Sequence, residues 1–329
     1  MKYMTIKHLY KKIKIPGIAY GIITMFLIFG LLTSWKNITL ANLILIARSS
    51  SVLLLASIGM TMVILVSQVD ISIGGVMSLA GVITASCLGN DINIIISILI
   101  GLLSGVVFGL FNGIMIAIYN FDYWISTFAT MGIASGIALV ISDGATVPIL
   151  DDTFNWIGNG KIGNVYTMIY IAIIAVVIIA IILKKTRFGY NIYSIGGSEQ
   201  SALFSGINVV GNRVLVYVCS GFFSAMAGVM LAAIGSSANP IGGINYSFDA
   251  MAAVIIGGTG FDGGKGGIFG TIIGVFMLRV LANGLGIMGI PATWQRAIIG
   301  FVIVSVLVID ALNEKQKRTK SKRRVYIDE

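Results

Sequence analysis

Histidine and cysteine are nearly absent from this chain of 329 residues. The only histidine is His8, so catalysis by imidazole groups has almost no material to work with. The two cysteines, Cys87 and Cys219, are isolated in apolar runs, which indicates neither a disulfide framework nor a cysteine metal site. Proline is also scarce, with four residues beside 41 glycines, and this balance is unlike that of a disordered or linker-rich chain.

Charged residues are also scarce, and their scarcity indicates the class of protein. Charged residues make up 11 % of the chain and hydrophobic residues 57 %, whereas a soluble domain carries about 25 % charged residues. Ten hydrophobic segments can be drawn, at residues 18–33, 43–66, 73–88, 94–119, 124–141, 168–183, 214–234, 248–258, 268–285 and 295–312. A membrane-spanning helix needs about 20 apolar residues. We therefore expect an all-α integral membrane protein with about ten transmembrane helices, forming one domain over residues 1–329.

The basic residues lie beside these hydrophobic segments. Five lysines precede the first segment, four cations lie in the loop 184–213, and seven lie in the tail 313–329. This distribution follows the positive-inside rule, so the net charge of +9 is a topology signal and does not indicate a nucleic-acid partner. Both termini and the loop 184–213 are predicted to be cytoplasmic. Alternation then requires the short segment 248–258 to cross, with irregular glycine-rich backbone that lines protein or water.

The loop 184–213 is a long polar segment with clustered cations between two hydrophobic blocks. Within it, Ser198 can accept hydrogen bonds from the free N–H groups of a first helical turn, and Glu199 suits the positive N-terminal end of a helix. Gly206 is a plausible stop. We expect a short helix over 198–205 that docks on a partner at the membrane surface, with a solvated connector as the alternative.

The glycine-rich stretch 249–274 can be compared with the P-loop, a glycine-rich motif that binds phosphate. A P-loop needs a glycine, four further residues, and then Gly-Lys followed by Ser or Thr. Around Gly264 and Lys265 the first position is Thr259 and the last is Gly266, and no soluble strand precedes them. The match fails, so the chain has no recognisable nucleotide site, and no cofactor is expected in it.

Four motifs, in order along the chain, resemble those of the inner-membrane permeases of monosaccharide ABC importers of the ribose, galactose and xylose type. They are Asp70-Ile71-Ser72-Ile73-Gly74; the series Gly101, Gly105, Gly109 and Asn112-Gly113; Thr186-Arg187-Phe188-Gly189 with Ile195-Gly196-Gly197, Glu199, Ala202 and Ser205-Gly206-Ile207; and Asp249 to Thr259 with Gly263 to Gly266. The resemblance covers about 42–310. It departs at Leu203, where members usually have arginine in the docking helix, and such departures bear on the substrate more than on the class.

The resemblance implies a helical fold similar to that of the vitamin B12-type (type II) importers, in a bacterial cytoplasmic membrane. It implies a two-subunit pore, made with a second copy or a paralogue, which takes substrate from an extracytoplasmic binding protein. A separate cytoplasmic ATPase would bind ATP and magnesium and drive transport, so the chain itself would not be an enzyme. The residues implied to couple the chain to that ATPase are Gly197, Ser198, Glu199, Ala202, Ser205, Gly206 and Ile207.

Polar residues beside apolar segments are candidates for the translocation pathway, because they are costly in lipid. The candidates are Asp70, Asn112, Asp249, Gly257 and Gly258. The expected function is import of a monosaccharide, a pentose such as ribose. One alternative within the class is the furanosyl quorum signal autoinducer-2. The alternative from another class is a secondary transporter that works without ATP, which would require acidic residues at the centre of the bundle.

Overall fold

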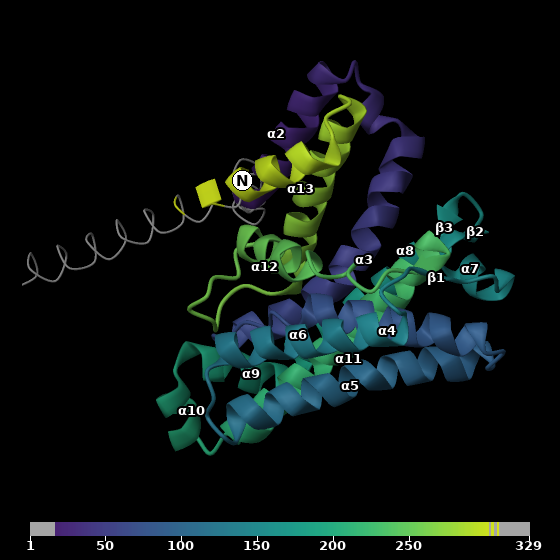
Figure 1. Cartoon of the computed structure of the whole chain (residues 1–329). Coiled ribbons are helices and arrows are strands. Elements are labelled where there is room, and N and C mark those ends of the chain that lie inside the picture. Colours follow the sequence, from purple (N-terminus) through teal and green to yellow (C-terminus); the bar gives the residue numbers. More distant parts are fainter. Residues whose placement is uncertain (1–16, 303, 306–307, 309–329) are drawn as a thin grey trace, which may run out of the picture.

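The computed structural model describes residues 17–302, 304, 305 and 308 of the chain. Its main helices are α2 (Gly17–Leu32), α3 (Leu40–Leu65), α4 (Ile73–Gly89), α5 (Ile94–Ala117), α6 (Tyr123–Ile141), α8 (Thr167–Lys185), α11 (Val209–Gly235), α12 (Tyr246–Ile256) and α13 (Ile268–Ile287). Residues 292–302 are helical as well. In Figure 1, α2 and α13 stand above a lower layer that contains α4, α5, α6 and α11, and α3 runs from the first group into the second.

Short elements connect these helices. They are the 3₁₀ turn η1 (Lys36–Ile38) and the helices α7 (Asp152–Asn159), α9 (Arg187–Gly197) and α10 (Glu199–Phe204). Two antiparallel pairs of two-residue strands complete the set: β1 (Val147–Pro148) with β4 (Ser237–Ala238), and β2 (Lys161–Ile162) with β3 (Val165–Tyr166). Helices α9 and α10 come before α11 in the chain. Helix α7 packs against α11.

The helix lengths bear out the prediction of an all-α membrane protein. Among the described residues, six helices are long and apolar enough to cross a membrane, namely α3, α5, α6, α8, α11 and α13. Three shorter apolar stretches lie within α2, α4 and α12. Nine of the ten predicted segments coincide with helices to within a few residues. The tenth, 295–312, overlaps the helix at 292–302, and its later part falls mostly outside the described residues.

Helix α11 is the packing centre of the lower layer. It packs against α5, α3 and α4 (Figure 1). Gly221 on α11 lies directly against Gly105 and Gly109 on α5, so that a Cβ atom at Gly221 would come within 3.0 Å of the Gly109 Cα atom. Lipid tails are as apolar as leucine and give helices little hydrophobic reason to associate, so close backbone packing through small residues supplies the attraction instead.

Replacing Gly221 with leucine should force α5 and α11 apart, because no space exists for a side chain. We expect the free energy of unfolding to fall by about 1–3 kcal/mol, as in overpacked cores. The matched control is Gly132→Leu on α6, where an added Cβ atom meets no heavy atom within 4 Å. Thermal unfolding of the purified protein in detergent checks this, and equal midpoints for the two variants would contradict the packing role.

Candidate functional site

Helix α9 is the first element at the polar end of the bundle and lies beside the last turn of α8. Its N-cap is Thr186, whose Oγ1 accepts a hydrogen bond from the Gly189 N–H at 3.3 Å. Ile192 and Ile195 are buried against the chain, and Phe188 is half-buried. This helix was not predicted from the sequence, although these three apolar residues follow the i, i+4, i+7 spacing of an amphipathic helix. The prediction for this loop rested on its four cations and not on this spacing.

Helix α10 bears out the predicted short helix and its end signals. The Ser198 hydroxyl accepts a hydrogen bond from the Ser201 N–H at 3.3 Å, as an N-cap should. Gly206 follows the helix with φ of +77°, and the Ile207 N–H returns to the Ala202 carbonyl at 3.0 Å. This left-handed glycine turn closes the helix and sends the chain back toward the bundle.

The two faces of α10 have different environments. Ala202 is 2 % exposed and packs within the chain's own core. The next two side chains point outward, with Leu203 53 % and Phe204 91 % exposed. Ala202 thus seats α10 on its own chain, and its part in coupling stays a prediction. The exposed apolar surface of α10 is formed by Leu203 and Phe204.

Glu199 and Arg213 fix α10 to the start of α11. Arg213 donates from Nη1 and Nη2 to the two carboxylate oxygens of Glu199, at 2.9 and 2.6 Å. This two-pronged geometry defines orientation more than stability, because the Glu199 side chain is largely exposed to water. Gly197 ends α9 and is exposed, and Ser205 is the C-cap of α10. The part these residues play in coupling stays a prediction.

The segment 257–267, which joins α12 to α13, lies against α9. The Gly264 N–H donates to the Leu65 carbonyl at 3.0 Å, and the Tyr193 hydroxyl donates to the Gly266 carbonyl at 3.0 Å. Burial raises the pKa of the Tyr193 phenol, and so further favours the protonated form that donates this hydrogen bond. Positive φ angles occur at Gly258, Gly263, Gly264, Gly266 and Gly267. The predicted irregular glycine-rich backbone is therefore confirmed.

Gly257 and Gly258 occupy different environments within this segment. Gly257 is buried against α13, where a Cβ atom would lie 2.5 Å from the Gly270 carbonyl oxygen. Gly258 is exposed and has φ of +85°. Gly257 thus permits close packing of α12 on α13, and Gly258 permits the turn that follows. Their membership of a translocation pathway stays a prediction.

Asp70 and Asn112, two further pathway candidates, come together in one buried network. Asp70 accepts from the backbone and hydroxyl of Ser72 through Oδ1, and from the Ser220 hydroxyl at 2.6 Å through Oδ2. Asn112 donates to the Ser72 hydroxyl at 2.9 Å and accepts from the Thr130 hydroxyl at 2.6 Å. All five residues are at most 2 % exposed. Their polar groups are used by the protein itself, which joins α4, α5, α6 and α11; a role in the pathway stays a prediction.

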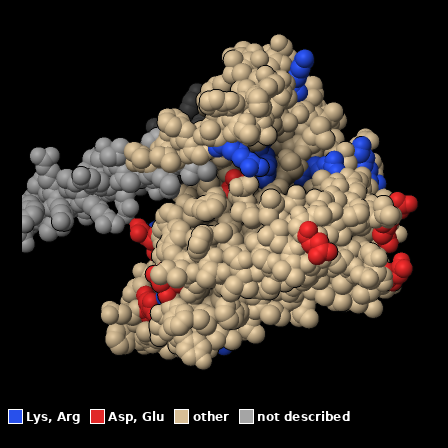
Figure 2. Space-filling view, in the orientation of Figure 1, with Lys and Arg blue, Asp and Glu red and all other residues tan. Residues whose placement is uncertain are grey.

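Asp249, the remaining candidate, lines a cavity of about 380 Å³ between α12, α13 and the helix at 292–302. Its polar lining consists of Asn245, Tyr246, Asp249, Arg279, Gln295 and Arg296. The Arg279 guanidinium carbon lies 5.4 Å from the centre of the Tyr246 ring. The Nε and Nη2 atoms of Arg279 are buried and have no hydrogen-bond partner among the described residues. Figure 2 shows basic side chains, with an acidic one beside them, at a hollow between the upper helices and the lower layer.

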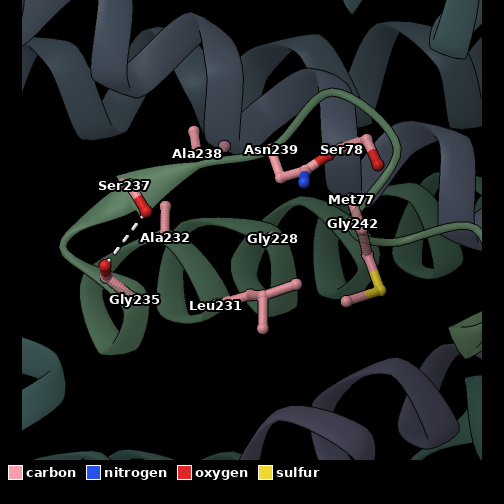
Figure 3. A pocket seen from close by; sticks show the side chains of 11 residues that line it. Met77, Ser78, Gly228, Leu231, Ala232, Gly235, Ser237, Ala238, Asn239 and Gly242 are labelled. Atoms are coloured by element: carbon pink, nitrogen blue, oxygen red, sulfur yellow. Dashed lines mark hydrogen bonds between the residues drawn. The ribbon is translucent and has the colours of Figure 1, made fainter. Parts of the chain in front are cut away.

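A second cavity, of about 220 Å³, lies between α4, α11 and β4 (Figure 3). Two of its polar side chains already accept hydrogen bonds, since Ser78 accepts from the Gly243 N–H and Asn239 from the Ile241 N–H, both at 2.9 Å. Around them lie glycines and apolar side chains such as Leu231. The cavity around Asp249 is chemically better suited to a polar ligand. No group of three His, Cys, Asp or Glu suited to a metal ion occurs among the described residues.

A family model described as "Branched-chain amino acid transport system / permease component" matches residues 42–307. The chain belongs to this permease family. The permease is 35 % identical over 282 residues to the "Ribose import permease protein RbsC" of Escherichia coli (strain K12), covering 84 % of the chain and 87 % of that protein. RbsC of Bacillus subtilis (strain 168) is 36 % identical over 271 residues, covering 82 % and 84 %. The "D-allose transport system permease protein AlsC" of Escherichia coli (strain K12) is 33 % identical over 290 residues, covering 88 % and 89 %. No solved structure matches the chain.

These matches confirm the resemblance to permeases of monosaccharide ABC importers that the motifs predicted. Together with the apolar helices they make the chain a multi-pass membrane protein. Each of three motifs behind the resemblance has a structural role in the fold. Asp70 anchors the central network, the loop 184–213 forms α9 and α10, and the glycine segment 257–267 packs on α9.

Gly264→Ala should loosen the contact between the segment 257–267 and α9. Its φ of +65° is strained for alanine, and the added Cβ atom would lie 2.6 Å from the Gly197 nitrogen. Hydrogen exchange of the α9 amides should rise about tenfold, which corresponds to about 1.4 kcal/mol of lost protection. Gly260→Ala is the control, since a Cβ atom there meets nothing within 4 Å. Unchanged exchange in both variants would mean that this contact does not hold α9.

Proposed function

We propose that this permease is the transmembrane pore subunit of an ATP-driven ABC importer that carries a monosaccharide, a pentose such as ribose, into the cytoplasm. The observation that carries the proposal is the exposure of Leu203 and Phe204, 53 % and 91 %, at the tip of a cation-rich loop. Water disfavours two adjacent large apolar side chains at such a tip, and an aromatic anchor of this kind suits the pocket of a partner protein.

The relatives support a sugar as the substrate. The ribose permeases are 35 %, 36 % and 37 % identical to the chain in three bacteria. The D-allose permease is 33 % identical and the L-arabinose permease 32 %. The family description names amino-acid transport, but these relatives are named for sugars. Among them the ribose permeases have the highest identities to the chain, which favours ribose. The furanosyl quorum signal is the alternative cargo for the same machinery.

We infer that ATP and magnesium are bound by a separate ATPase, which holds α10 in a cleft. A binding protein would deliver sugar at the opposite end of α11, beside α7 and β4. Support comes from the length of α11, whose 27 residues span about 40 Å at about 1.5 Å per residue. A second permease subunit would pack beside the charged cavity around Asp249 and shield it from lipid, because charged groups are costly where they face lipid.

We also infer a ten-span, type II topology in the cytoplasmic membrane, with the termini and the loop 184–213 inside. Three segments that alternation assigns to the inside are in contact. Ser67, after α3, donates to the Asp262 carbonyl at 2.8 Å and, at 3.4 Å, to the Gly196 carbonyl at the end of α9. Residues 1–16 and 309–329, which carry most of the predicted cytoplasmic cations, lie outside the described residues.

An ATP-independent transporter would need an acidic group that exchanges an ion during each cycle. The Asp70 carboxylate is 1 % exposed, and both of its oxygens accept hydrogen bonds from serine groups. Protonation would break up a network that joins four helices. This arrangement argues for a structural anchor and therefore favours an external source of energy.

Phe204→Ala should weaken assembly with the ATPase about thirtyfold, because an aromatic anchor contributes about 2 kcal/mol to an interface. ATP-driven sugar uptake should fall in parallel while the folded permease is retained. Titrated co-purification with the ATPase and uptake in proteoliposomes are the measurements. The control is Phe128→Ala, which removes a side chain that is 60 % exposed on the apolar helix α6. If the Phe204→Ala variant assembled with the ATPase as well as the wild type does, α10 would not be the docking site.

Sidedness can be tested by cysteine labelling after Cys87 and Cys219 are replaced by alanine. A cysteine at Leu150, which is 90 % exposed between β1 and α7, should react with a membrane-impermeant maleimide added to sealed cells. A cysteine at Gln200, which is exposed on α10, should react only after the cells are opened. Labelling of the Gln200 position in sealed cells would invert the proposed orientation.

A further inference from the structure

The cavity around Asp249 brings ionised side chains together without pairing them. Arg279 and Arg296 are the positive groups that act on the Asp249 carboxylate. Among the residues that the structure describes, however, the ion pair within 4.0 Å is Arg213 with Glu199. Asp249 and the two arginines are therefore close enough to attract each other, yet they are held apart along the wall of one cavity.

Within the part of the chain that the structure describes, the same groups make no hydrogen bond to the protein. Arg279 has two buried nitrogen atoms, Nε and Nη2, that have no acceptor there. No hydrogen bond to the Asp249 carboxylate occurs among the described residues, whereas Gln295 donates to the Ile290 carbonyl at 2.7 Å. Buried polar groups are nearly always satisfied, so a cluster that is not satisfied indicates a missing partner. That partner must both donate and accept.

We propose that this cavity binds the hydroxyl groups of a neutral monosaccharide, with Asp249 as the acceptor and Arg279 as the donor. The assignment rests on the proposed sugar import and names where in the permease the sugar is contacted. A hydroxyl group donates one hydrogen bond and accepts two, so adjacent hydroxyls on one ring satisfy both walls. Asp249 repels an anion and the arginines repel a cation. The volume of about 380 Å³ lies within the range of about 300–1,000 Å³ for small-molecule sites.

Such a site gives the permease a selection step of its own, after delivery by the binding protein. A sugar that lacks one hydroxyl leaves a charged group unpaired, and sites of this kind discriminate strongly against such analogues. The cavity walls are α12 and α13, and the segment 257–267 between them touches α9. The helices that would hold the sugar are thus tied directly to the end of the bundle that carries α10.

Binding can be tested on the permease alone by protection of a cysteine. Ala282 lines the cavity, and Ala282→Cys in a protein without other cysteines provides a small reporter there. D-ribose should slow its reaction with a methanethiosulfonate reagent about tenfold, whereas sodium D-gluconate and choline chloride should not. Asp249→Asn in the same background should abolish the protection. Protection by gluconate or choline, or by none of the three, would overturn the site.

Selectivity can be tested in the complete complex with its ATPase and binding protein. Asp249→Asn and Arg279→Lys should reduce the preference for D-ribose over 2-deoxy-D-ribose, measured as the ratio of kcat/KM for uptake, about tenfold. ATPase stimulation by the loaded binding protein should persist. The control is Asp91→Asn, which removes an exposed charge at a left-handed turn that asparagine tolerates.

The outcomes separate the two proposals. If the wild-type complex does not import D-ribose, the proposed cargo fails. If it imports D-ribose while both variants keep the wild-type preference, or while the sugar does not protect Ala282→Cys, the cavity assignment alone fails. Should Asp249→Asn be lost through misfolding, Arg279→Lys and the protection assay with Asp249 intact still decide the matter.

Discussion

The Asp70 carboxylate, 1 % exposed inside the bundle, accepts hydrogen bonds from Ser72 and from Ser220 on α11. This interaction is needed because the chain breaks its helices here, and free backbone groups away from water are costly. Ser247 at the start of α12 supports the same break, accepting from the Gly74 N–H at 2.8 Å and donating to the turn before α4 at 2.7 Å. The central helices therefore share one network.

From the polar end of the bundle to the charged cavity, the contacts are continuous. Helix α10 follows α9 directly, and the Tyr193 hydroxyl joins α9 to the Gly266 carbonyl. Gly266 belongs to the segment between α12 and α13, which form two walls of the cavity that holds Asp249 and Arg279. A partner that displaces α10 through Phe204 would thus act on the cavity walls through backbone contacts. We propose this chain of contacts as the route by which energy from ATP would reach the sugar.

Sequence alone predicted the features that depend on local chemistry. Hydropathy located nine helices, and Ser198 and Gly206 marked the ends of α10 because caps and left-handed turns are local. The features that the sequence did not predict involve tertiary packing. The inward direction of Ala202 depends on which face of α10 meets the core, and the unpaired state of Arg279 depends on three helices meeting. Asp70 could be recognised as a special polar residue, but its partner Ser220 lies 150 positions away.

Reconstitution from purified parts is the most direct test of an ATP-driven pore. Permease, ATPase and binding protein are placed in proteoliposomes, and accumulation of radiolabelled D-ribose is followed with ATP, with a non-hydrolysable analogue, and with imposed proton or sodium gradients. We expect accumulation only when all three proteins and hydrolysable ATP are present. Accumulation by the permease alone, driven by an ion gradient, would contradict an ATP-driven pore.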